Sequence, residues 1–283
     1  MKRAMPGILL VILFALCFLA PAIEQALHFS SNEADLASRF LPPSFTHFLG
    51  TDELGRDIFL RLLYGGQISL TVALAAGFAS ALIGTTVGMI AGYFGGRWDA
   101  LLMRLTDLLI SLPSLPLLII LSALDLQKLG LSADIANSPR VSLYKMVVLI
   151  SFLSWTTVAR LARARTLTLR QMDFVRAARA LGVSDLRIVL RHVFPNLMNT
   201  VVVATALAVG NIILMESVLS FLGLGIQPPL PSWGNMLTHA EETIWEHAQL
   251  SVYPGMMIFV TVLSFNFLGD AIQKARDPKE TRR

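Results

Sequence analysis

Most side chains able to bind metal or to transfer protons lie between the apolar stretches of this sequence. His239, Glu241, Glu242 and His247 are close enough in the chain to suggest metal ligands. They do not form the His-Glu-x-x-His pattern of a helical zinc site, so a solvated loop face is the favoured interpretation. The sequence also lacks the Gly-x-x-x-x-Gly-Lys-Ser/Thr loop that cradles nucleotide phosphates. We therefore expect no catalytic residue, no metal and no cofactor bound by this chain.

A second charged group consists of Asp52, Glu53, Arg56 and Asp57 and precedes a long apolar stretch. One interpretation is contact with an external protein or a solute. The other is local loop structure, in which glycine turns and salt bridges within the group hold the loop together. The local interpretation is favoured, and the contact interpretation stays open.

Six apolar stretches occupy most of the chain and determine its class. Of the 283 residues, 54% are hydrophobic and 15% are charged, whereas a soluble domain carries about 25% charged residues. A helix needs about 20 mostly apolar residues to cross the hydrocarbon layer of a membrane. We therefore predict an all-α integral membrane protein with about six transmembrane helices. The stretches are residues 6–23, 67–95, 108–124, 143–159, 197–222 and 250–268.

Small residues recur at every fourth position of the second stretch. They are Ala76, Ser80, Gly84, Gly88 and Gly92. This spacing puts them on one helical face, where the backbone of another helix can approach closely. Helix packing is the favoured interpretation, and a pore-lining face is the alternative.

Three other residues are unusual for apolar stretches. Pro113 and Pro116 remove backbone donors, so they predict a kink or a break at the start of the third stretch. Glu216 lies near the outer end of the fifth stretch. An acid at membrane depth is a candidate functional group, and we expect it to form a hydrogen bond with a neighbouring helix or loop.

The basic residues predict how the chain is oriented. With both termini inside, the inside segments hold 17 of the Lys and Arg residues and the outside segments hold six. Lys and Arg accumulate in cytoplasmic segments, so we predict an N-in, C-in topology. The net charge of +4 does not indicate nucleic-acid binding, because the basic residues lie between apolar spans rather than on one soluble face.

The longest inside segment, residues 160–196, contains two short predicted helices between the fourth and fifth spans. The first helix is expected to stop at Gly182, and the second to begin at Ser184 or Asp185. Pro195 is expected to end the second helix before the fifth span. The first helix and its stop contain a shallow surface of small residues that suits docking to a partner or to the membrane. This surface, expected on one face, is Ala177, Ala178, Leu181 and Gly182.

This segment resembles the cytoplasmic signature of the permeases of binding-protein-dependent ABC importers. That signature is Glu-Ala-Ala, three residues, Gly, nine residues, then Ile-x-Leu-Pro. Ala177, Ala178, Gly182 and Pro195 match it in spacing, whereas Arg176 replaces the Glu, His192 the Ile and Phe194 the Leu. The resemblance implies a coupling helix pair that docks on an ATPase. The implied coupling residues are Asp173, Arg176, Ala177, Ala178, Arg179, Leu181, Gly182 and Pro195.

Two further segments resemble the peptide and nickel subgroup of these importers. Residues 47–57 resemble its motif before the second span, and residues 219–236 resemble its segment after the fifth span. The resemblance covers about residues 45–275. Within the subgroup, the chain is similar to the C-type permease. The residues of its outer-loop motif are Gly50, Thr51, Asp52, Gly55, Arg56 and Asp57.

The resemblance implies a permease subunit in the bacterial inner (plasma) membrane, with several partners. These are a second related permease, two cytoplasmic ATPases that bind ATP and Mg, and an external substrate-binding protein. The solute would be a peptide or a related small solute such as nickel, and the lack of a Cys, His or Met cluster within the spans favours peptides. A secondary transporter is the alternative, but it would not need the inside helix pair.

Three regions follow from this interpretation. Residues 1–66 would form the N-terminal transmembrane helix and an outer loop. Residues 67–275 would form the importer transmembrane domain, and residues 276–283 a cytoplasmic tail.

Overall fold

The computed structural model describes residues 5–28, 30–128, 130–136, 138–238 and 240–275. Within these ranges the secondary structure is helical, with no β-strand and one isolated antiparallel bridge between Thr51 and Asp57. The longest helices are α3 (Ile58–Phe94), α7 (Pro139–Arg170), α10 (Phe194–Phe221) and α12 (Gln249–Ala275). The other α-helices are α1 (Met5–Phe18), α2 (Ala20–Leu27), α4 (Gly96–Ser111), α5 (Ser114–Ser122), α6 (Ala133–Ala136), α8 (Asp173–Ala180), α9 (Asp185–Ile188) and α11 (Ala240–Thr243). Short turns of other helix types are η1 (Leu36–Ser38), η2 (Val189–Val193) and η3 (Asn235–Leu237).

The number of possible membrane spans agrees with the predicted six. Four helical segments of the described chain are long and apolar enough to cross a membrane, and the longest of these, 58–94 and 185–221, have 37 residues each. Two bent pairs, α1 with α2 and α4 with α5, bring the number to six if each pair is one span. The all-α membrane fold is therefore confirmed.

The third predicted span, residues 108–124, is interrupted near its start. α4 ends at Ser111, and α5 begins at Ser114 after a bend of 84°. Leu112 has an extended backbone, because the ring of Pro113 disfavours the helical conformation in the residue that precedes it. Pro116 lies in the first turn of α5, where its missing N–H leaves no helical bond unmade. The predicted break is confirmed, but α4 begins 12 residues earlier than the predicted span.

α3 and α7 pack closely through the predicted ladder of small residues. A Cβ atom at Gly84 would lie 2.6 Å from the carbonyl oxygen of Trp155, and one at Gly88 would lie 2.3 Å from that of Ala159. A Cβ atom at Gly92 would lie 2.8 Å from the carbonyl oxygen of Arg163. Only residues without a side chain allow two backbones to approach this closely. The packing interpretation of the ladder is confirmed.

α4 lies against α7 through two ion pairs. Arg163 of α7 forms a bidentate pair with Asp99, and Arg160 Nη2 lies 2.6 Å from Asp107 Oδ1. Asp99 and Asp107 of α4 are therefore both paired with arginines of α7. Other side chains of α4, including that of Trp98, are apolar and exposed.

The N-terminal helix belongs to the same bundle. Leu10, Leu13 and Cys17 of α1 join the core formed by α3, α10 and α12. The predicted boundary between residues 66 and 67 falls inside α3, which begins at Ile58. Residues 276–283, predicted as a cytoplasmic tail, lie outside the described residues.

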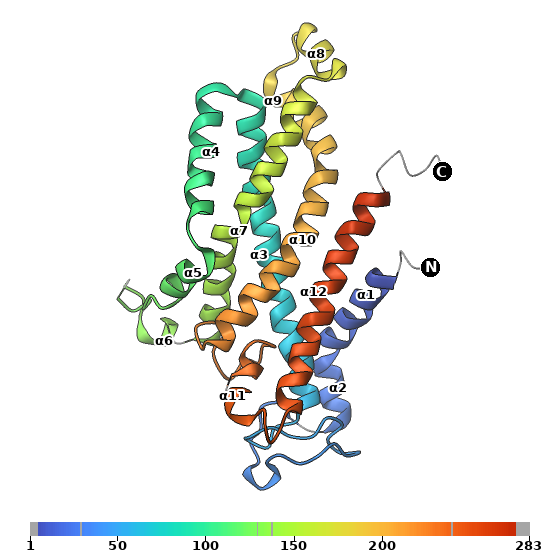
Figure 1. The fold of residues 1–283 in the computed structure, drawn as a ribbon, viewed down its shortest axis with the longest axis vertical. Helices are drawn as coiled ribbons and strands as arrows, with labels where there is room; N and C mark the ends of the chain where they lie inside the picture. Colours follow the sequence, from blue (N-terminus) through green and yellow to red (C-terminus); the bar gives the residue numbers. More distant parts are fainter. Residues whose placement is uncertain (1–4, 29, 129, 137, 239, 276–283) are drawn as a thin grey trace.

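The two ends of the bundle differ in the segments they carry (Figure 1). α8, α9 and the start of α4 lie at one end of the bundle. α11 and the loop that precedes α3 lie at the other end. The start of α1 and the end of α12 both point toward the end that carries α8. The segments predicted to be inside therefore share one end, as the predicted topology requires. Which end faces the cytoplasm stays a prediction.

Candidate functional site

The coupling segment begins with α8, which ends in a regular C-terminal cap. The N–H groups of Gly182 and Val183 donate to the carbonyl oxygens of Arg179 and Ala178, at 3.0 and 3.1 Å. This pair of bonds is the Schellman motif, which requires a left-handed residue at the glycine position. Gly182 has a φ of 76°, so the predicted glycine stop is confirmed. The chain then turns into α9 after Ser184.

The predicted docking face is divided by the way α8 packs. Ala177, Leu181 and Gly182 are exposed, and the Leu181 side chain is 83% exposed. Ala178 is 8% exposed and packs inward together with Val175. The expectation that Ala178 shares the exposed face is wrong, because α8 must bury one stripe against the bundle. The four remaining predicted coupling residues, Asp173, Arg176, Arg179 and Pro195, are exposed.

A tyrosine at the end of α3 holds the coupling segment in place. The Tyr93 hydroxyl donates to Asp185 Oδ1 at 2.6 Å and accepts from Arg179 Nη2 at 3.1 Å. Arg170 Nη1 donates to the Tyr93 carbonyl oxygen at 2.8 Å. The hydrogen bond with the Tyr93 hydroxyl raises the pKa of Arg179 above its ordinary value. Tyr93 is 3% exposed, so one buried side chain links α8 and α9 to α3.

Sequence reasoning missed Tyr93. Its partner Asp185 lies 92 residues further along the chain, so no local pattern joins the two. The available signal was a single phenol in the last turn of a helix whose second half otherwise consists of apolar and small residues.

The prediction that Pro195 ends the second helix is wrong. α9 continues through the π-helical turn η2 into α10, and residues 185–221 form one helical segment. Pro195 therefore lies inside this helical segment, where its ring and its missing backbone N–H disturb the regular α-helical pattern. The wider turn at Val189–Val193 precedes it, and such turns relieve the clash between a proline ring and the preceding turn.

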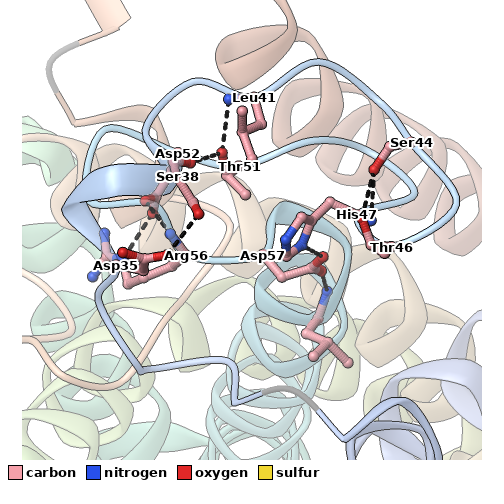
Figure 2. Close-up of polar contacts among 11 residues, drawn as sticks. Asp35, Ser38, Leu41, Ser44, Thr46, His47, Thr51, Asp52, Arg56 and Asp57 are labelled. Atoms are coloured by element: carbon pink, nitrogen blue, oxygen red, sulfur yellow. Dashed lines mark hydrogen bonds and ion pairs between the residues drawn. The ribbon is translucent and has the colours of Figure 1, made fainter.

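The outer-loop motif is held by hydrogen bonds within the loop (Figure 2). Thr51 is 1% exposed; its hydroxyl accepts from the Leu41 N–H at 2.8 Å and donates to the Ser38 carbonyl oxygen. Asp57 caps α3, because its Oδ1 accepts from the Leu60 N–H at 2.8 Å. The other carboxylate oxygen of Asp57 lies 2.9 Å from His47 Nδ1. These two motif residues therefore act on the loop and on the start of α3.

Asp52 organises the remaining turn of the motif. Its Oδ1 accepts from the N–H groups of Leu54 and Arg56, at 2.9 and 3.0 Å, and its Oδ2 accepts from Arg56 Nε at 2.8 Å. A Cβ atom at Gly55 would lie 1.8 Å from the Asp35 carbonyl oxygen, and the φ of Gly55 is 74°. Gly50 also has a positive φ, of 80°. The local interpretation of the motif is confirmed by these contacts.

Asp35 supports the same loop from the preceding segment. Its Oδ2 accepts from the Ser38 hydroxyl at 2.6 Å, and its Oδ1 accepts from the Ala37 N–H at 3.1 Å. The hydrogen bond from Ser38 lowers the pKa of Asp35 below its ordinary value. Figure 2 shows Asp35 on the same side of the loop as Arg56.

Glu216 is fully buried between α3 and α10. Its Oε2 accepts from the Ser69 hydroxyl of α3 at 2.9 Å, and its Oε1 accepts from Ser220 at 2.7 Å. The expected hydrogen bond to a neighbouring helix is confirmed. The Ser69 hydroxyl oxygen in turn accepts from the backbone N–H of Trp233 at 3.2 Å. Through Ser69, Glu216 therefore also supports the segment after α10.

Within the described residues, no group of three or more His, Cys, Asp and Glu side chains is placed to hold a metal ion. Of the four residues that suggested a metal site, His239 lies outside the described residues. The ring of His247 stacks on Phe40, with centroids 4.0 Å apart.

Comparison with known proteins finds a family whose sequence model matches this chain. The sequence model of the family described as "Binding-protein-dependent transport system inner membrane component" matches residues 84–282. The glutathione transport system permease protein GsiD of Escherichia coli O157:H7 is 41% identical over 237 residues, which are 84% of this chain and 74% of that protein. The protein of the same name from Pectobacterium atrosepticum is 36% identical over 273 residues, which are 96% of this chain and 85% of that protein.

The fold is also similar to a solved transporter structure. A chain of the methionine ABC transporter MetNI, in an inward-facing conformation, aligns with a TM-score of 0.59. The alignment covers 76% of this chain and 95% of that chain, at 17% sequence identity.

Proposed function

Because the chain belongs to the family of binding-protein-dependent transport system inner membrane components, we propose that it moves a peptide-like solute into the cytoplasm, through a pathway between itself and a second permease. The chain is a multi-pass inner-membrane permease of an ABC importer. The relatives named for glutathione transport support a peptide-like solute, since glutathione is a modified tripeptide.

The partners we propose are a second related permease, two cytoplasmic ATPases and an external substrate-binding protein. ATP and Mg would bind the ATPases, and this chain would supply the membrane pathway and the docking segment. Membership of a family of binding-protein-dependent transport components supports this assembly.

One observation carries the docking role: the coupling segment protrudes from one end of the bundle and is fixed from within. Leu181 is 83% exposed, whereas Tyr93 at the end of α3 is 3% exposed and bonds to Asp185 and Arg179. A protruding apolar side chain on a rigidly held turn suits insertion into a groove of a partner. We propose that α8 and α9 dock on one ATPase, and that ATP-driven motion of the ATPase moves them.

The proposal is tested by affinity purification of the tagged chain in mild detergent, with identification of the proteins recovered. We expect a second permease and two ATPases with the unchanged chain. Gly182→Trp should reduce ATPase recovery and abolish uptake, while the amount of membrane-inserted chain stays the same.

Gly130→Trp is the matched control, because Gly130 also has a positive φ and nothing within 4 Å of a Cβ atom. It carries the same backbone strain in a loop predicted to lie outside. Full ATPase recovery and normal uptake with Gly182→Trp would contradict the docking role. Recovery of the unchanged chain without any ATPase would contradict the importer assembly.

A further inference from the structure

A cavity of about 330 Å³ lies at the end of the bundle that carries the outer-loop motif. Its walls come from the start of α3, the end of α10, the segment that follows α10 and the start of α12. The volume is in the range of sites that bind small molecules. These walls meet only in the folded chain, because they lie far apart in the sequence.

Arg61 contributes a buried cation to this cavity. Its exposed fraction is 7%, and its Nε lies 3.5 Å from Asp52 Oδ2. Its Nη1 is buried without a hydrogen-bond partner among the described residues. A buried donor without a partner is unfavourable, and more so when it carries charge. The guanidinium therefore has unused capacity for an anionic group.

Ser251 lines the same cavity from the start of α12. Its Oγ is also buried without a partner in the described part of the chain. A guanidinium and a hydroxyl from two helices can together bind a carboxylate, since each donates to one of its oxygens. The half-buried carboxylate of Glu53 also lines the cavity.

The wall opposite the start of α3 is held in place before any ligand arrives. Asn235 Nδ2 donates to the carbonyl oxygens of Ile226 and Leu230, at 3.2 and 2.9 Å. Gln227 Nε2 donates to the Gly223 carbonyl oxygen at 3.0 Å. A wall fixed by its own hydrogen bonds reduces the entropy lost on binding.

We infer that this cavity binds a peptide-like zwitterion, with its carboxylate on Arg61 and Ser251 and its amino group toward Glu53. The inference rests on the proposed function, and it assigns a carboxylate-binding site within this single subunit at the outer end of the pathway. A solute released at this end would meet the site before it enters the space between the two permeases.

The test measures equilibrium binding of glutathione to the purified complex in lipid nanodiscs, without the binding protein. Glutathione should bind the unchanged complex, and its diethyl ester, which lacks both carboxylates, should bind at least tenfold more weakly. Arg61→Gln should weaken glutathione binding by about tenfold to a hundredfold, as expected for a lost charged hydrogen bond. It should also abolish the preference for glutathione over the ester.

Two variants separate this effect from damage to the fold. Ser251→Ala removes a hydroxyl that has no partner in the described chain, so it should leave thermal stability unchanged and weaken binding about two- to tenfold. Lys128→Gln makes the same charge change as Arg61→Gln at an exposed position away from the cavity, and it should leave binding unchanged. No glutathione binding to the unchanged complex, equal binding by Arg61→Gln, or equal binding of the ester would overturn the inference.

Uptake in proteoliposomes with ATP and the binding protein tests the proposed function separately. Uptake of glutathione by the unchanged complex, with binding that does not depend on Arg61, would remove the inferred site and leave the importer function. Carboxylate-dependent binding without ATP-driven uptake would keep the inferred site and overturn the proposed function.

Discussion

Gly88→Ala should separate α3 from α7 and destabilise the bundle. The added Cβ would lie 2.3 Å from the Ala159 carbonyl oxygen, 2.7 Å from the Ala162 Cβ and 2.9 Å from the Arg163 nitrogen. Two of these atoms belong to the backbone of α7, so no side chain can rotate away. Ordinary contact begins near 3.4 Å, so the helices must move apart by roughly 1 Å locally, which loses dispersion contacts along the seam. Overpacking of this kind costs about 1–3 kcal/mol.

Gly255→Ala is the control, because Gly255 also lies in a long helix and nothing is within 4 Å of its Cβ position. Both variants gain helix propensity, worth about 1 kcal/mol at a helix interior. The measurement is the thermal unfolding midpoint of the purified complex in mild detergent. Gly88→Ala should have a lower midpoint than the unchanged protein, and Gly255→Ala an equal or higher one. Equal midpoints for the two variants would refute the argument that the close approach of α3 and α7 stabilises the fold.

Three further outcomes are expected. Tyr93→Phe should lower uptake more than ATP hydrolysis, because it removes the hydroxyl that joins Asp185 to Arg179; an unchanged ratio of solute moved to ATP hydrolysed would contradict this. Asp57→Ala should destabilise the protein by about 0.5–2 kcal/mol through loss of the α3 cap, measured by thermal unfolding, whereas the same change at exposed Asp35 should have a smaller effect. A reporter fused after Arg170 should be cytoplasmic, and its detection outside would contradict the predicted topology.

The sequence predicts those features that depend on local spacing. The four-residue ladder in α3 identifies one helical face because the period of a helix is fixed, and the structure packs that face on α7. The stop at Gly182 is also local, because only glycine adopts the left-handed cap without strain. The turns at Gly50 and Gly55 follow the same logic.

Features that depend on distant neighbours could not be predicted. The burial of Ala178 is decided by the bundle surface beneath α8, and the sequence of α8 alone does not contain that information. A proline can end a helix or lie in a helix that continues next to a wider turn, so Pro195 did not reveal that α9 and α10 are continuous. The contacts of Tyr93 and of Arg61 likewise join segments that no motif connects.

The continuity of α9 and α10 gives the coupling segment a long lever arm. The segment 185–221 has 37 residues, which corresponds to a length of about 55 Å. Each degree of tilt at one end therefore moves the other end by about 1 Å. Ser220, at the far end, lines the cavity that contains Arg61 and also bonds to Glu216. A tilt of the docked end of this arm would thus change the width of the cavity at the opposite end, unless the wider turn at Val189–Val193 bends and absorbs it.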